Sequence, residues 1–288
     1  MLPRPEDITP DMYDALNREI ERAFEEGCHG NCASCSSQCG KPIYPRYAKA
    51  LYAVTGGKGG TGKSTITALL AAALAKRGLR VVILDADIAG ATQPRLFGAA
   101  GKITGMEKQG KEGIKVLTPL ALPCGVELMS FDLFDRGSLA EPVLLPGKDM
   151  FDVVSYFYTN GAWEGFDIIL VDMPSGAGDI PLNLYSSFPV DGTVIVAEPG
   201  ELGALQTLRC IALCSMLMSP PVAFVENKAL EDRCTADALY PLPPDCVRTF
   251  LPLSPDISLA AETGSAAKIS PPSLTPVVKR LSELKYSR

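Results

Sequence analysis

A glycine-rich run near the amino-terminal quarter of the chain most constrains what it can fold into. From Gly57 to Ser64 it fits the spacing G-x-x-x-x-G-K-[ST], with an apolar run, Leu51 to Val54, before it and a helix-like run, Ile66 to Lys76, after it. In this context backbone N–H groups turn inward around a di- or triphosphate. We expect the phosphates to bind at Gly57, Lys58, Gly59, Gly60, Thr61, Gly62, Lys63, Ser64 and Thr65.

Acidic residues end two further apolar runs. Arg80 to Leu84 leads into Asp85-Ala86-Asp87, and Phe166 to Val171 leads into Asp172. Ligands of open α/β folds bind at the carboxyl ends of parallel strands, so these acids are expected beside the phosphate loop. Carboxylates there suit Mg²⁺ held through water, together with the Ser64 hydroxyl, while Lys63 neutralises the β and γ phosphates. The alternative for a single Asp is a cap on the next turn.

The chain contains nine cysteines, more than packing alone usually requires. Four of them, Cys28, Cys32, Cys35 and Cys39, follow a C-x3-C-x2-C-x3-C spacing in a segment of small and polar residues. Closely spaced thiolates favour a [4Fe–4S] cluster, with zinc or free thiols as alternatives. His29 inside the loop is expected to be solvated, although an imidazole can replace one thiolate. Cys210 and Cys214, four residues apart among apolar neighbours, are expected to be buried.

Strand-like and helix-like runs alternate along the chain, which predicts an α/β fold with a mostly parallel sheet flanked by helices. Residues 1–44 form an expected small appendage, an amphipathic helix over 10–26 plus the cysteine loop, and residues 45–288 form the expected nucleotide-binding domain. Further strands are expected at 114–117, 126–129, 192–197 and 222–226, with helices at 150–158 and 201–218. The segment 90–113 is expected to be loop.

Charge and hydropathy exclude several classes of protein. The formal net charge of −6 gives no broad basic face for nucleic acid. No apolar run approaches the roughly 20 residues that span a bilayer, and the first residues lack the basic and apolar regions of a signal peptide. A protein of the cytoplasm, without a nucleic-acid or membrane partner, is the expectation. Disulfides are disfavoured in that reducing compartment.

The residues that follow the strand expected at 222–226 indicate which nucleotide base is bound. Glu226-Asn227-Lys228-Ala229-Leu230 has an Asn, but Leu230 stands where guanine-reading proteins usually carry an Asp. The acceptor for the guanine N1–H is therefore missing, so ATP is expected, with Asn227 contacting the adenine edge. The glycine-rich segment 173–179 is expected to move with the γ-phosphate.

Five blocks together resemble the Mrp (ApbC-type) family of iron–sulfur carrier and scaffold ATPases, within the MinD, ParA and nitrogenase iron protein superfamily. The blocks are residues 56–65, 84–90, 171–179, 225–227 and 252–257. The resemblance implies a deviant P-loop fold, an ATP-hydrolysing homodimer, and delivery of a [4Fe–4S] cluster to recipient apoproteins. It also implies that Lys58 reaches the partner's nucleotide, that Asp87 positions the attacking water, and that Asp85 and Asp172 support Mg²⁺.

The chain also departs from that family. Its paired C-x2-C after the Asn-containing strand is absent, and the nearest candidates for a cluster bridging two subunits are Cys234 and Cys246. Cluster binding is therefore expected mainly at the amino-terminal loop. Ser175 and Ala177 stand where the family usually has proline and threonine, so hydrolysis is expected to be slow or differently gated.

Two other functions remain open at this level. One is an ATP-gated electron donor similar to the nitrogenase iron protein, although no cysteine lies between Val171 and Pro181, where such reductases place a cluster ligand. The other is a MinD- or ParA-like positioning switch without a redox role. Against this function, the present chain shows no basic amphipathic tail of the kind that binds membrane surfaces.

Overall fold

The computed structural model describes residues 44–102, 108–109, 115–133, 143, 145, 147–229 and 240–283. The expected amino-terminal helix and the four-cysteine loop therefore lie outside the described residues, as do Leu230 and Cys234. In the described part no helix is long and apolar enough to cross a bilayer.

An eight-stranded sheet forms the centre of the molecule, in the order β10-β9-β8-β1-β7-β2-β6-β5. Neighbouring strands run parallel, except that β5 pairs antiparallel with β6 at one edge. Central strands are apolar throughout because both of their faces are covered. The strands are β1 (Ala50–Thr55), β2 (Val81–Asp85), β5 (Leu120–Ala121), β6 (Val126–Met129), β7 (Ile168–Asp172), β8 (Gly192–Ala197), β9 (Pro221–Ala229) and β10 (Val247–Pro252).

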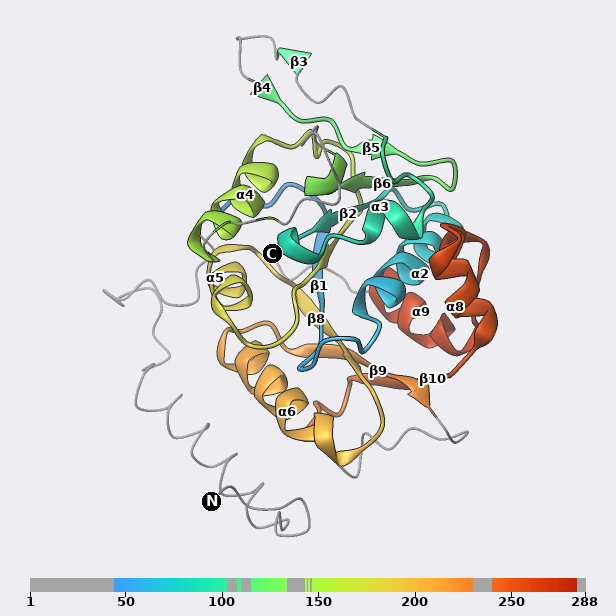
Figure 1. The fold of residues 1–288 in the computed structure, drawn as a ribbon. Helices are drawn as coiled ribbons and strands as arrows, with labels where there is room; N and C mark the ends of the chain where they lie inside the picture. The colour runs from blue at the N-terminus through green and yellow to red at the C-terminus, as the bar shows by residue number, and fades with distance from the viewer. Residues whose placement is uncertain are drawn as a thin grey trace, which may run out of the picture.

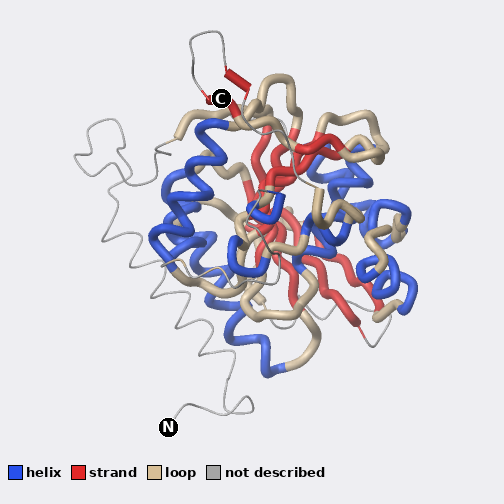
Figure 2. The backbone as a smooth tube through the Cα atoms, turned by 45° about the horizontal axis from the view of Figure 1, so that its top comes forward, coloured by secondary structure: helices blue, strands red, loops and turns tan. Residues whose placement is uncertain are grey.

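Helices cover both faces of the sheet, which gives three layers (Figures 1 and 2). One face carries α4 (Gly147–Asn160), α5 (Asp179–Ser187) and α6 (Glu201–Met216), and the other carries α2 (Lys63–Ala75) and α9 (Thr275–Glu283). The short α3 (Gln93–Leu96) and α8 (Pro255–Glu262) lie near α2. The prediction of a mostly parallel sheet flanked by helices is confirmed.

Each face has its own hydrophobic core. On the α4, α5 and α6 face, the Tyr158 ring stacks on Phe188 at 4.3 Å between ring centroids, and Trp163 donates its indole N–H to the Tyr158 carbonyl. On the other face, the apolar side chains of α2 are almost completely buried against β1 and β7. This packing holds the first turn of α2 rigidly at the end of β1, where the glycine run lies.

Three segments differ from the sequence expectations. The strand expected at 114–117 contributes only β4 (Lys115–Val116), which pairs with β3 (Lys108–Gln109) outside the main sheet. The segment 90–113, expected to be loop, contains α3, which Pro94 favours in its first turn. Finally, β10 was not expected, because apolar and polar residues do not alternate in its sequence, and only Thr249 and Leu251 of this edge strand are buried.

The different burial of two leucines, one on α2 and one on α6, predicts different losses of protein stability when each is replaced by alanine. Leu70 is fully buried on α2, whereas Leu205 on α6 is 37% exposed. Leu70→Ala should lower the free energy of unfolding by about 2–5 kcal/mol, because it leaves a cavity. Leu205→Ala removes the same atoms from a partly solvated position, so it should cost less than about 1 kcal/mol. Chemical denaturation measures both, and equal losses would contradict the assignment of the core.

Candidate nucleotide-binding site

Sheet order brings three segments to one edge. Strand β7 lies between β1 and β2, and Asp172 at its end is in register with Asp85 at the end of β2. The glycine run leaves the end of β1 at Gly56. All three strands are parallel, so their carboxyl ends meet, and both acids lie beside the loop. The structure thus brings together residues separated by more than a hundred positions in sequence.

The loop itself is shaped by glycines that have no room for a side chain or need a left-handed backbone. A Cβ on Gly57 would lie 2.1 Å from the Gln206 carbonyl carbon, so the loop packs directly on the backbone of α6. Gly62, with φ of 87°, forms the left-handed turn that starts α2. Lys63 follows as the first helical residue and is buried to 7% exposure.

Hydrogen bonds fix the carboxylate of Asp172. The Thr67 hydroxyl donates to Oδ1 at 3.1 Å, and the Gln93 amide donates to Oδ2 at 2.8 Å. The same Gln93 nitrogen also donates to the Ser64 carbonyl at 3.0 Å, so it connects the acid to the start of α2. Burial raises the pKa of Asp172 to about 6, against the hydrogen bonds of Gln93, Ser64 and Thr67, which lower it.

Asp85 is less completely paired than Asp172. The Ser130 hydroxyl donates to its Oδ2 at 2.9 Å, but its buried Oδ1 has no partner at hydrogen-bonding distance. Burial raises the pKa of Asp85 well above its usual value, and the nearby Asp172 raises it further. Two adjacent buried carboxylates with a free oxygen favour a bound cation, because a cation relieves both the repulsion and the desolvation. Oxygen ligands of this kind, next to a hydroxyl at Ser64, suit Mg²⁺.

Sequence reasoning did not identify three of these supporting residues. Thr67 lies one helical turn after Lys63, and Ser130 directly follows β6, so both had positional signals. Gln93 had none, since it lies in a segment expected to be loop and reaches the site only through the tertiary fold. The amide is fully buried, and its Oε1 has no hydrogen-bond partner.

Asp87 occupies a different environment from the other two acids. It precedes the 3₁₀ helix η2 (Ile88–Gly90), and its Oδ1 accepts a hydrogen bond from the Gly90 N–H at 3.2 Å. Its side chain is partly exposed at the same edge of the sheet. In this structure Asp87 therefore caps the amino end of η2, as the sequence-based alternative for a single Asp suggested.

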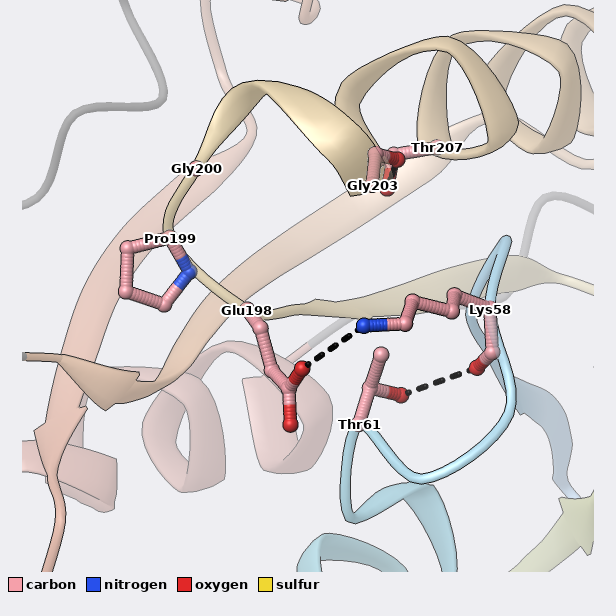
Figure 3. Close-up of a pocket in the computed structure, with 7 residues that line it drawn as sticks. All are labelled: Lys58, Thr61, Glu198, Pro199, Gly200, Gly203 and Thr207. Atoms are coloured by element: carbon pink, nitrogen blue, oxygen red, sulfur yellow. Dashed lines mark hydrogen bonds and ion pairs between the residues drawn. The ribbon is translucent and has the colours of Figure 1, made fainter.

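Lys58 and two residues that sequence reasoning missed, Glu198 and Lys228, form an ion-pair network beside the loop. Figure 3 shows the pair formed by Lys58 and Glu198. Glu198, directly after β8, contacts the Lys58 ammonium at 3.4 Å and the Lys228 ammonium at 2.5 Å. Lys228 also donates to the Gly60 carbonyl at 2.7 Å. A cavity of about 140 Å³ adjoins this network, lined by Lys58, Thr61, Glu198, Pro199, Gly200, Gly203 and Thr207.

A second cavity, of about 80 Å³, lies on the other side of the loop. It is lined by Gly62, Thr65, Asn227, Lys228, Pro252, Leu253, Ser254, Ile257, Ser258 and Ala261. The side-chain N–H of Asn227 donates a hydrogen bond to the Thr61 carbonyl at 2.7 Å, so strand β9 supports the loop at this point. The cavity combines apolar walls with a few polar groups, as sites for a flat base do.

The segment 173–179 touches the loop directly. The Gly176 N–H donates to the Gly56 carbonyl at 3.0 Å, and the Met173 N–H donates to the Val54 carbonyl at 3.1 Å. Ser175, Ala177 and Gly178 are exposed. A change at the phosphates therefore has a short backbone route into this segment.

Four cysteines lie in the described part of the chain, and three of them are buried. Cys210 and Cys214 are buried on α6, as expected, with Cys210 3.5 Å from the Thr55 hydroxyl. Cys246 is 3% exposed and directly precedes β10, at the amino end of that strand and hence at the opposite edge of the sheet from Asp172. Among the described residues no group of three or more Cys, His, Asp or Glu side chains is arranged to hold a metal ion. Cys28, Cys32, Cys35 and Cys39 lie outside that part.

The close packing of Gly57 provides a test of the loop. Gly57→Ala places a methyl group against the α6 backbone, so we expect it to displace the loop and to weaken ATP binding at least about tenfold. Gly178→Ala is the matched control, because it lies outside the phosphate loop and no atom lies within 4 Å of a Cβ built there. Isothermal titration with ATP distinguishes the two variants. Equal affinities would contradict the loop geometry.

Comparison with known proteins gives consistent relatives. The model of a family described as ParA, NUBPL iron-transfer P-loop NTPase, matches residues 47–237. The iron-sulfur cluster carrier protein of Clostridium perfringens is 31% identical over 226 residues, covering 71% of this chain and 78% of that protein. The chloroplastic Fe-S cluster assembly factor HCF101 of Arabidopsis thaliana is 30% identical over 292 residues, covering 95% of this chain and 53% of that longer protein.

A solved structure agrees with these relatives. The nucleotide-binding protein of Archaeoglobus fulgidus, in complex with ADP, superposes with a TM-score of 0.62 and 27% identity, over 84% of this chain and 94% of that one. The resemblance to iron–sulfur carrier P-loop ATPases is confirmed. Since the family model matches more than half of the chain, this protein belongs to the ParA, NUBPL iron-transfer family of P-loop NTPases.

Proposed function

We propose that this protein is an ATP-hydrolysing homodimer that binds a [4Fe–4S] cluster and transfers it to recipient apoproteins in the cytoplasm. The proposal is carried by the occurrence, in one chain, of a complete nucleotide-binding site and membership of an iron-transfer family. The phosphate loop adjoins a pair of buried carboxylates, and the chain belongs to a family described by iron transfer. The relatives named as cluster carrier and cluster assembly factor support the cargo.

In this proposal the loop from Gly57 to Thr65 binds the phosphates, and Lys63 neutralises their charge. Ser64, Asp85 and Asp172 hold Mg²⁺, which when bound neutralises negative charge on the phosphates. The buried, incompletely paired Asp85 supports this donor set. Adenine lies against the surface beside Asn227, at the mouth of the smaller cavity, and the Asn227 amide keeps the loop in place.

Lys58 and Asp87 complete the proposed catalytic groups. Lys58 is half-exposed at the rim of the site, which supports contact with the nucleotide of a second subunit. The Gly90 N–H occupies only Oδ1 of Asp87, so Oδ2 is the oxygen proposed to accept a hydrogen bond from the attacking water. Slow or gated hydrolysis is proposed through the exposed segment 173–179.

The cargo site is assigned to the appendage of residues 1–44, through Cys28, Cys32, Cys35 and Cys39. Four thiolates within twelve residues suit a cubane cluster. A second cluster shared between subunits through Cys234 and Cys246 would require the buried Cys246 side chain to reach the surface. The amino-terminal loop is therefore the principal cargo site of the proposal, and residues 45–288 are its ATPase domain.

The cargo assignment is tested by metal analysis. Protein purified without oxygen should show iron–sulfur absorption and about four iron atoms per bound cluster, because a cubane contains four irons. The variant with serine at positions 28, 32, 35 and 39 should lose that iron, whereas Cys124→Ser, at a partly exposed cysteine in the described region, should keep it. Colourless, zinc-loaded protein would contradict the proposal.

The role of Lys58 is tested by kinetics. Lys58→Ala should lower kcat for ATP hydrolysis by tenfold or more, since a cation supplied in trans to phosphoryl transfer contributes about 10³–10⁵ in other P-loop enzymes. It should also abolish ATP-dependent dimers, measured by light scattering. Lys76→Ala is the control, because Lys76 is an exposed lysine that follows α2 at its far end. Normal hydrolysis by Lys58→Ala would rule out the cross-subunit role.

A further inference from the structure

Glu198 stands out because it is an acid at the edge of a phosphate site. Its carboxylate lies directly after β8 and is 24% exposed. A negative charge here opposes the binding of an anion, so its presence calls for a purpose other than phosphate binding. Both of its oxygens face lysines, with Lys58 at Oε2 and Lys228 at Oε1.

The two lysine contacts differ in kind. Lys228 is 2.5 Å from Glu198, donates at the same time to the Gly60 carbonyl, and has a left-handed backbone with φ of 58°. A lysine is held in that conformation only when its surroundings fix it. Lys228 is therefore a fixed support that strand β9 gives to the loop, and Glu198 is its counter-ion.

Lys58 is held much less firmly. Its ammonium is 3.4 Å from Glu198, and its side chain is 45% exposed. Figure 3 shows the side chain extended toward Glu198, with Pro199, Gly200 and Gly203 around the adjoining cavity. Gly203 has no side chain, and a Cβ built there would meet no atom closer than the Lys58 Cδ, at 3.9 Å. Exposed ion pairs of this kind are worth at most about 1 kcal/mol.

We propose that Glu198 is a positioning residue that holds Lys58 within its own subunit until ATP-dependent dimerisation takes the lysine across to the partner. This inference rests on the proposed function, because it needs the cross-subunit role of Lys58. The weak contact favours the resting position of Lys58, and a triphosphate in the partner offers more negative charge than one carboxylate. Lys228 keeps Glu198 in place, so the acid remains available when Lys58 returns.

The ionisation of Glu198 agrees with this role. Partial burial raises its pKa, but the hydrogen bonds and charges of Lys228 and Lys58 outweigh burial and hold the pKa below its usual value. The carboxylate is therefore charged at neutral pH while it contacts both lysines.

The test is Glu198→Gln, measured through ATP-dependent dimerisation. The amide oxygen still accepts a hydrogen bond from Lys228, so the loop keeps its support, but the charge that holds Lys58 is gone. We expect the ATP concentration for half-maximal dimer, measured by sedimentation velocity, to fall about two- to fivefold. KM for ATP should fall with it, more than kcat changes. Glu164→Gln, an exposed position beyond α4, is the charge-matched control and should cause no shift.

A second background separates this role from simple support of the loop. In Lys58→Ala protein, which forms no ATP-dependent dimer, Glu198→Gln should leave the Kd for ATP measured by isothermal titration unchanged, because there is no Lys58 to release. The role of Glu198 would be overturned by unchanged or weaker dimerisation in the otherwise wild-type protein, or by an equal change of the Kd for ATP in both backgrounds. If wild-type protein forms no ATP-dependent dimer, the proposed function fails first, and this inference fails with it.

Discussion

The position of β7 between β1 and β2 is the constraint on which the site depends. It brings Asp172 and Asp85 side by side at the carboxyl edge of the sheet, next to the phosphate loop. Burying two carboxylates together is costly unless donors and a cation compensate for it. Ser130, Thr67 and Gln93 supply donors in the protein itself, and the unpaired Asp85 oxygen leaves a place for the cation.

The same loop is held from several directions, and each contact connects it to a different element. Gly57 packs on the backbone of α6, Asn227 holds Thr61 from β9, and Gly176 donates to Gly56 from the segment after β7. Lys58 is half-exposed, and its ammonium lies 3.4 Å from the carboxylate of Glu198. The loop thus combines a tightly packed backbone with one weakly held charged side chain, as the proposed exchange of partners by Lys58 requires.

Local patterns in the sequence were enough to predict the loop, the strands that end in Asp85 and Asp172, and the layered sheet. These features follow from residues that are neighbours in the chain. Three residues of the site, Gln93, Glu198 and Lys228, could not be predicted. Their hydrogen-bond partners lie 29 to 168 positions away in the sequence, and no sequence motif connects them to those partners. Strand β10 escaped because an edge strand is only partly buried, so its pattern resembles that of a loop.

The central proposal is that this ATPase delivers a bound cluster to an acceptor protein, and an assay of cluster transfer tests it most directly. Holo-protein labelled with radioactive iron is mixed with an apo-ferredoxin under anaerobic conditions, with ATP, with ADP or without nucleotide, and iron in the separated acceptor is followed over time. The account predicts that the transfer rate changes with ATP and that the donor loses the iron that the acceptor gains. Iron that stays with the donor under all three conditions, or a transfer rate that is the same with ATP, with ADP and without nucleotide, would contradict it.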